Sequence, residues 1–406
     1  MEGHLLQALI FLMLSNGADS YLEQMTEVRR RLHEYPELSN REFQTQAYLR
    51  QKLHEAGFET IDLMAKTGIR VVYDTGKPGP VIAFRADIDA LPVTERTGLA
   101  FSSKNEGVMH ACGHDIHTAI VFGVALAIRD NPDLTGKFVF IFQPAEEGPP
   151  PGEDGGASLM ISDGVLKDPV PDVIFGVHGM GWLPVGEIGV RTGGIMARAD
   201  RFYVKIKGKQ AHGSTPHLGV DPIFIASEVV TTAQSIVSRR TDSRDPVVLS
   251  FGEFNAGQRF NIIPESASLS GTIRTLSVET GDKIPQLLDQ VIAGVTQAHG
   301  GSYTFENETM CPSVQNDAEW TQKSVEVLRT GGFTVREVAP VLAAEDFAYY
   351  AEKIPGVYFF IGVCETDECA NIHSPDYNPS EKTMTAGANF FLHLAKSFAG
   401  SGTDNL

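Results

Sequence analysis

The sequence has few cysteines and no excess of basic residues, and both shortages limit what the protein can be. Four cysteines are spread over 406 residues, too few and too scattered for a disulfide framework. Cys364 and Cys369 are near enough for a local bridge or metal loop, but we expect free thiols. Lysine and arginine number 33 against 51 acidic residues, a formal net charge of −18. That charge argues against a nucleic-acid partner, because phosphates select basic surfaces.

Long apolar runs are also missing, so no segment is long enough to span a bilayer and we expect no membrane partner. The run LLQALIFLML (5–14) has the length of the apolar part of a signal peptide, and the SNGA that follows suits a cleavage site. The preceding MEGH lacks the basic residues of such a signal. We therefore interpret the segment as a first helix or an added end and expect a cytoplasmic protein, with export as the alternative.

The order of apolar segments predicts an α/β protein. Residues 21–58 predict two helices interrupted at Pro36, with Gly57 ending the second. Near-continuous apolar strands then alternate with helical stretches, which is typical of a mostly parallel sheet buried on both faces. The expected strands are GIRVVYDT (68–75), PVIAFRADIDALP (80–92), KFVFIFQPAEEG (137–148), DVIFGVHG (172–179) and PGVYFFIGV (355–363).

A different pattern occupies the middle of the chain. Between about 196 and 306 the expected order is strand, helix, two strands, helix and strand, which is the order of a ferredoxin-like unit. We therefore predict one α/β domain built from residues 1–195 and 307–406, interrupted by an inserted α/β domain over 196–306.

Candidate metal ligands follow the ends of several predicted strands, where open α/β sheets bind their ligands. A single carboxylate at such a place is usually a helix cap or a solvated loop residue. Five ends carrying carboxylates or imidazoles make coincidence a poor explanation and favour a metal site. These residues are Asp87, Asp89, Glu146, Glu147, His178 and His373, together with the stretch VMHACGHDIHTA (108–119).

That stretch has three candidate explanations: metal binding, thiol chemistry or a polar turn. In an extended segment, residues two apart face the same way, so Cys112 and His114 are the best pair to converge on one centre. Once a helix starts near Asp115, His114 and His117 become neighbours one turn apart. A cysteine next to a histidine is also a candidate nucleophile, and that alternative stays open at this point.

The adjacent Glu146 and Glu147 suit hydrolysis. Two neighbouring carboxylates at a strand end point in different directions, so one can bind metal while the other stands beside a bound water. A metal lowers the pKa of that water, and a carboxylate can carry its proton to the leaving group. The alternative is a pair of solvated glutamates on the loop that continues into GPPPGEDGG.

Nine sequence words resemble the M20 metallopeptidase family, more narrowly its amidohydrolase branch of hippurate hydrolases, N-acyl-amino-acid aminoacylases and auxin-conjugate hydrolases. They run in the family's order from about residue 25 to 390. The words are RRRLHEYPELSNRE, RADIDALP, MHACGHDIHTA, QPAEEG, GVHG, GKQAHGSTPHLGVDP, NIIPESASLSGTIRT, AEDFAYY and NIHSPDYN.

The resemblance implies a catalytic domain that holds two divalent cations and an inserted lid domain that forms homodimers. Glu146 would be the general base, and Cys112 would bridge the two ions. The metal ligands it implies are Cys112, His114, Glu147, His178 and His373. A thiolate bridge tolerates Zn²⁺ or Mn²⁺, so the metal is one of these or a related ion.

The resemblance also implies roles beyond the ligands. His212 would stabilise the developing oxyanion, often across a dimer interface, and Asn261 and Arg274 would hold the substrate carboxylate. Asp87 would orient a metal ligand. The remaining members of the opening stretch, His110, His117 and Asp115, would have supporting roles, the last as a helix-start cap, and Glu345 and Asp346 would support the site or cap locally.

Two departures from the wider family concern the site itself. Arg85 stands where most of these peptidases have histidine, and Cys112 stands where they have a bridging aspartate; both are usual in the amidohydrolase branch. The implied reaction is hydrolysis of an N-acyl or N-aroyl amino acid to a carboxylic acid and a free amino acid. A carboxypeptidase or dipeptidase acting on short peptides is the alternative. A non-catalytic metal- or ligand-binding protein is a remote one, against which the intact Glu146 counts.

Overall fold

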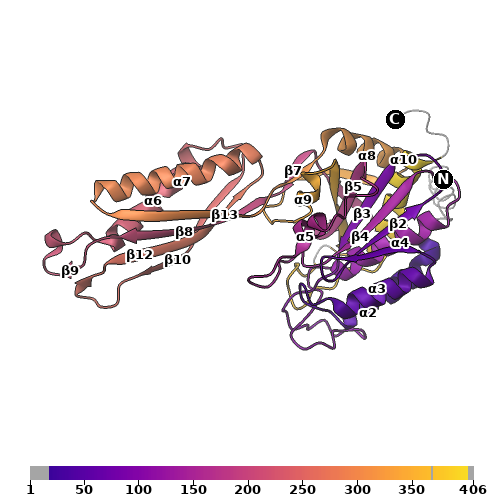
Figure 1. The fold of residues 1–406 in the computed structure, drawn as a ribbon, viewed down its shortest axis with the longest axis horizontal. Helices are drawn as coiled ribbons and strands as arrows, with labels where there is room; N and C mark the ends of the chain where they lie inside the picture. Colours follow the sequence, from indigo (N-terminus) through magenta and orange to yellow (C-terminus); the bar gives the residue numbers. More distant parts are fainter. Residues whose placement is uncertain (1–17, 367–368, 401–406) are drawn as a thin grey trace. The chain divides into compact units, whose positions relative to one another are not determined.

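The computed structural model describes residues 18–366 and 369–400, and their contacts divide the chain into two compact units (Figure 1). Unit 1 takes the chain up to Gly193, then Asn316–Val338 and the chain from Tyr349 onward. Unit 2 takes Gly194–Gln315 and the short segment Ala339–Ala348. The range 196–306, predicted for the inserted domain, lies within unit 2. The apolar segment 5–14 lies outside the described residues.

Unit 1 is built on an eight-stranded sheet of order β1-β2-β4-β3-β5-β16-β6-β15. Its central strands β4, β3, β5 and β16 run parallel to one another, which confirms the predicted α/β class. Strands β3, β4 and β16 are buried along nearly their whole length because helices cover both faces. The strands are β1 (Thr60–Met64), β2 (Gly68–Asp74), β3 (Val81–Asp87), β4 (Lys137–Gln143), β5 (Val173–Pro184), β6 (Glu187–Val190), β15 (Thr334–Glu337) and β16 (Gly356–Cys364).

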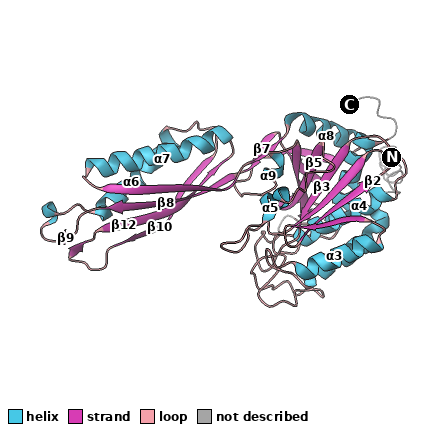
Figure 2. Ribbon diagram, viewed as in Figure 1, coloured by secondary structure: helices cyan, strands magenta, loops and turns pink. Residues whose placement is uncertain are grey.

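The helices of unit 1 surround this sheet (Figure 2). Every residue of α4 from His114 to Ile128 is buried, because the helix packs against β3, α2 and α10. Helix α2 ends at Glu34, just before Pro36, as the sequence predicted. The helices are η1 (Ala18–Tyr21), α2 (Leu22–Glu34), α3 (Phe43–Glu55), α4 (His114–Arg129), α5 (Gly156–Ser162), α8 (Ala318–Thr330), α9 (Ala348–Ala351, which begins at the unit boundary) and α10 (Lys382–Ala399).

Unit 2 has the strand and helix order that the sequence predicted, and its sheet order β10-β12-β8-β13 is that of a ferredoxin-like unit. All neighbouring strands are antiparallel, and buried and exposed residues alternate along β8 because α6 and α7 cover one face. The main elements are β8 (Arg198–Lys207), α6 (Pro222–Arg239), β10 (Val247–Ala256), β12 (Ser266–Thr275), α7 (Val278–Ala298) and β13 (Ser302–Cys311). The smaller ones are β7 (Gly193–Met196), β9 (Ala211–His212), η2 (Pro216–Leu218), β11 (Ile262–Ile263) and β14 (Val314–Asn316).

Two further features bear on the sequence predictions. Cys364 and Cys369 form a disulfide, so the expectation of free thiols was wrong for this pair. The chain turns back after β16 and brings the two Cα atoms to 5.9 Å, within the range that a disulfide requires. Among residues 18–366 and 369–400, none of the helices combines the length and apolar character needed to cross a membrane.

Candidate metal centre

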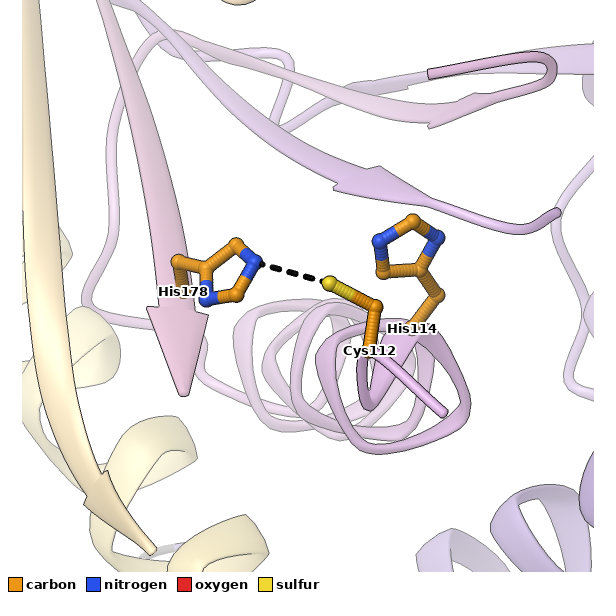
Figure 3. A group of neighbouring side chains, drawn as sticks. All are labelled: Cys112, His114 and His178. Carbon is orange, nitrogen blue, oxygen red and sulfur yellow. Dashed lines mark hydrogen bonds between the residues drawn. The ribbon is translucent and has the colours of Figure 1, made fainter. Parts of the chain in front are cut away.

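The predicted ligands from unit 1 meet where the parallel strands end and α4 begins. His178 lies in β5, Cys112 immediately precedes α4, and His114 is the first residue of that helix (Figure 3). The Sγ atom of Cys112 lies 3.3 Å from Nε2 of His178. All three side chains are buried, so the centre is shielded from bulk water on the side of the sheet.

Gly113 makes this approach of Cys112 and His114 sterically feasible. Its φ of 93° lies in the left-handed region, which favours glycine. A Cβ atom at this position would also come within 3.3 Å of the hydroxyl of Tyr377. Gly113 therefore turns the chain sharply from an extended segment into α4 and places the side chains on either side of it in one site.

Two of the groups of candidate ligand atoms share one residue, Cys112. The first group is Cys112, His114 and His178, and the second is Cys112, Glu147 and His373. Within each group the candidate ligand atoms lie within 4.8 Å of one another. In the second group, Nε2 of His373 is 3.3 Å from Oε1 of Glu147. The shared position of Cys112 is the position that a bridging ligand between two ions would occupy.

The residues present fit a pair of divalent ions. Nε2 of His114 is buried and has no hydrogen-bond partner among the described residues. The carboxylate oxygens of Glu146 and Glu147 lie 3.7 and 3.9 Å from it, beyond hydrogen-bonding distance. A buried polar atom without a partner carries a cost unless something binds it. A thiolate, imidazoles and carboxylates are together the ligand types of zinc and related borderline ions.

The protonation states of the ligands favour metal binding coupled to proton release. Burial lowers the pKa of His178 to about 3, so its imidazole is neutral and able to coordinate. Burial raises the pKa of the Cys112 thiol, which therefore keeps its proton until a metal displaces it. Burial opposes the charged form of His114, but the negative charge of Asp87 outweighs it and raises the pKa of the imidazole. Metal binding should therefore tighten as the pH rises.

Asp89 holds two of the candidate ligands, a role that the sequence analysis missed. Its Oδ1 lies 3.2 Å from Nδ1 of His114, and its backbone carbonyl lies 2.9 Å from the same nitrogen. Its Oδ2 accepts hydrogen bonds from Ser39 and from the backbone N–H of Glu147. The alternation of RADID shows that Asp87 and Asp89 face one side, but the sequence does not show which histidine each one meets.

The turn that carries Glu146 and Glu147 is held by a buried glutamate. Ala145, just before the pair, has a φ of 53°, and its N–H donates to Oε1 of Glu42. Burial raises the pKa of Glu42 to about 7. Because a left-handed conformation is costly for alanine, this bond helps to keep the turn in place. Only 10% of the Glu146 side chain is exposed, and it lies beside His114.

Asp87, predicted to orient a ligand, contacts His117 rather than His114. Its Oδ1 lies 2.7 Å from Nδ1 of His117 and 3.9 Å from Nδ1 of His114. His110 is buried, and neither of its ring nitrogens has a hydrogen-bond partner among the described residues. Burial lowers the pKa of His110 to about 4, so its imidazole is neutral.

The expectation that Asp115 caps the helix was wrong. Gly113 occupies the N-cap position of α4, and Asp115 falls inside the first turn. Its carboxylate instead accepts hydrogen bonds from the buried side chains of Arg29 and His33. This network joins α2 to α4 directly behind the ligand segment.

The other predicted site residues belong to unit 2. His212 is exposed in β9, where its Nδ1 accepts hydrogen bonds from the backbone and hydroxyl of Ser214. The β9–β11 pairing places Asn261 beside it, since the N–H of Gly213 donates to the Asn261 carbonyl. Arg274 lies near the other end of β12, paired with Ala199.

Unit 2 therefore does not bring all its predicted substrate residues together. At about 3.3 Å per residue, Ser266 and Arg274 are on the order of 26 Å apart along β12. Asn261 and His212 lie beyond the Ser266 end of that strand, next to β9 and β11 (Figure 1). A site that uses both His212 and Arg274 cannot be assembled from one copy of unit 2.

The chain is similar to proteins of known type over nearly its whole length. Residues 83–397 match a family model described as peptidase family M20/M25/M40. The chain is 38% identical to the N-acetyl-L-cysteine deacetylase of Bacillus subtilis (strain 168), over 94% of this chain and 90% of that protein. It is 37% identical to thermostable carboxypeptidase 1 of Saccharolobus solfataricus, over 95% of this chain and 98% of that protein.

A solved structure gives the same result. The YXEP protein of Bacillus subtilis, a dinuclear metal-binding peptidase of the M20 family, matches with a TM-score of 0.82 and 36% identity. The match covers 93% of this chain and 98% of that one. At this identity and coverage, the likeness extends over both units of the chain.

Proposed function

The chain belongs to peptidase family M20/M25/M40 and is a hydrolase of C–N amide bonds, and from this premise we propose that it removes the acyl group from N-acyl or N-aroyl amino acids. The products are a carboxylic acid and a free amino acid. The observation that carries the proposal is the pair of ligand groups that share Cys112, with Glu146 beside them.

Two divalent ions per chain, Zn²⁺ or Mn²⁺, would be held by Cys112, His114, Glu147, His178 and His373. When bound, they would lower the pKa of a water molecule and polarise the carbonyl of the scissile amide. The similarity to a dinuclear metal-binding peptidase supports this number of ions.

Glu146 moves the proton. Its carboxylate takes a proton from the attacking water and delivers it to the amide nitrogen, so that the amine can leave. The side chain is suited to this role because it is next to the ligands yet retains some exposure, and Glu147 beside it takes the ligand position. The hydrogen bond from Ala145 to Glu42 holds the turn that carries both carboxylates.

His212 stabilises the developing oxyanion, and Asn261 and Arg274 bind the substrate carboxylate. Because His212 and Arg274 lie at different ends of unit 2, we propose that each site of a homodimer takes Arg274 from one chain and His212 from the other. Unit 2 also exposes several large apolar side chains, which an interface would cover. These are Ile223, Phe224, Phe254, Phe260, Ile262 and Met310.

A mixed dimer tests the exchange of residues between chains. Glu146→Gln and His212→Asn chains would be co-expressed with different tags, and the dimer that carries both tags would be isolated. If His212 acts across the interface, one of the two sites keeps both residues and about half of the wild-type turnover returns. If His212 acts within its own chain, the mixed dimer is as inactive as either parent.

A carboxypeptidase or dipeptidase is the second candidate, favoured by the 37% identity to a thermostable carboxypeptidase. Both reactions release an α-amino acid from an amide bond and differ only in what the acyl side carries. Protein loaded with Mn²⁺ or Zn²⁺ would be tested on N-acetyl and N-benzoyl amino acids and on dipeptides with the same leaving amino acid. We expect kcat/KM to be higher for the acyl amino acids. Higher values for dipeptides would favour the peptidase, and no turnover of any substrate by metal-loaded protein would favour a binding protein.

The compartment is a separate proposal. The sequence analysis expected a cytoplasmic protein, but disulfides persist mainly in oxidising compartments, and Cys364–Cys369 is one. We therefore propose that the protein works in an oxidising compartment. If the cells are lysed in denaturant with an alkylating reagent, two cysteines per chain, Cys112 and Cys311, should be alkylated; alkylation of four would contradict the proposal.

A further inference from the structure

We infer that His117 is the positioning residue for His178: it fixes the backbone of Gly179, and Gly179 in turn fixes the imidazole of His178. The inference rests on the proposed function, because the orientation of His178 matters only if that side chain binds metal. His117 itself touches no reacting atom and is not proposed as a ligand.

Both ring nitrogens of His117 are already occupied. Nε2 accepts the backbone N–H of Gly179 at 2.9 Å, so this nitrogen carries no proton. The proton is therefore on Nδ1, which donates to Oδ1 of Asp87 at 2.7 Å. The side chain is fully buried. These contacts leave His117 with one tautomer and no lone pair for a metal.

The N–H of Gly179 needs this partner because the pairing of β5 with the neighbouring strand has ended before it. Strand β3 pairs with β5 only as far as Gly176. Beyond that point the backbone of β5 has lost a neighbour on this side, and a buried N–H without an acceptor costs free energy. His117, on α4, supplies the acceptor that the neighbouring strand no longer provides.

Gly179 passes this constraint on to His178. Its carbonyl accepts the Nδ1–H of His178 at 2.9 Å. With the proton on Nδ1, the lone pair of His178 is on Nε2, the nitrogen that lies 3.3 Å from Sγ of Cys112. The ring centroids of His117 and His178 lie 4.8 Å apart. Both hydrogen bonds, from the Gly179 N–H to His117 and from His178 to the Gly179 carbonyl, therefore act on the same residue.

Asp87 and Arg85 anchor the other end of this chain of contacts. Oδ2 of Asp87 accepts a hydrogen bond from Arg85 at 2.8 Å, and both side chains are fully buried. Arg85 in turn donates to Gln143 at the end of β4. A buried carboxylate held in this way fixes the tautomer of His117. Asp87 thus acts on His178 through His117, while Asp89 acts on His114.

The decisive measurement is metal affinity, by competition with a chromophoric chelator, in two variants of His117. His117→Phe keeps a ring but removes the acceptor for Gly179, and we expect metal to bind about 10- to 100-fold more weakly. In His117→Gln, the amide oxygen can accept from Gly179, and the affinity should return to within a few-fold of wild type. His393→Phe, which replaces a partly buried histidine whose ring bonds the carbonyl of Val327, is the control and should bind as wild type does.

The outcomes separate this inference from the proposed function. Unchanged affinity in His117→Phe, or equal losses in the Phe and Gln variants, would overturn the positioning role while leaving the metal site in place. A wild-type protein that binds no metal would overturn the proposed function. If His117→Phe does not fold, ¹⁵N NMR of the metal-free wild type decides: we expect the proton of both His117 and His178 on Nδ1, and a His178 proton on Nε2 contradicts the inference.

Discussion

The metal centre of unit 1 and the His212 region of unit 2 are built in opposite ways. Cys112, His114 and His178 are at most 5% exposed and fixed by neighbours from several elements. His212 is exposed, and among the described residues its ring is bonded only to Ser214, two residues away. The side chains of the first region are therefore already held in place, whereas we propose that His212 completes a site only against another surface.

This difference separates metal binding from turnover. The ligand set lies entirely within unit 1, so metal affinity should not depend on the tip of unit 2. Turnover should depend on both regions, because the oxyanion and the substrate carboxylate are assigned to His212, Asn261 and Arg274. Variants in each region therefore test whether metal affinity depends on unit 1 alone while turnover depends on both units.

The largest effect is expected for Glu146→Gln. The amide cannot take up the proton of the attacking water, so kcat should fall by roughly a thousandfold or more. Metal content should stay at the wild-type level, because Glu147 is the proposed ligand. Glu153→Gln, which changes a partly exposed glutamate on the same loop that pairs with Arg41 and Lys66, is the matched control. Turnover near the wild-type rate in Glu146→Gln would contradict the proposed mechanism.

A smaller loss is expected for His212→Asn. Removing one oxyanion donor typically lowers kcat by about 10²- to 10³-fold, and metal affinity should not change. His217→Asn, exposed in η2 a few residues away, serves as the control and should leave both quantities unchanged. A loss of metal from His212→Asn would break the comparison, because it would place the residue within the metal centre.

The stability of unit 1 should also depend on pH through a buried histidine, His33. Burial lowers the pKa of His33, but Asp115 and Glu95 outweigh it and raise the pKa to about 9. A raised pKa means that the folded protein holds this proton more tightly than the unfolded chain. The resulting stability is fully present below about pH 6.5 and is lost as the pH rises to about 9, a change of order 3 kcal/mol.

Urea unfolding of the metal-free protein at pH 6 and pH 9.5 measures this contribution. At pH 6 the free energy of unfolding of the wild type should exceed that of His33→Gln, and this difference should disappear by pH 9.5. A free-energy difference between the two proteins that is the same at both pH values would contradict the assignment.

The sequence was sufficient for the features that depend on local periodicity. Apolar runs predicted the strands, and the side chains at their ends predicted a metal site there. The ligand set that includes Cys112, Glu147 and His178 came from the family resemblance. The partners of each ligand could not be predicted, because they are set by contacts between distant elements. Asp115 was assigned to a helix cap, but its carboxylate accepts a hydrogen bond from Arg29, which lies 86 positions earlier in the chain. No local pattern reveals a contact over that separation.

Metal stoichiometry in wild type and Cys112→Ala tests the central claim most directly, because that claim is a two-ion centre with one shared thiolate. Elemental analysis of metal-loaded, dialysed protein should find two ions per wild-type chain. Removing the shared ligand should lower the occupancy of both positions in Cys112→Ala. If Cys112→Ala kept two tightly bound ions and lost only turnover, Cys112 would not be the bridge, and the account of the site would be wrong.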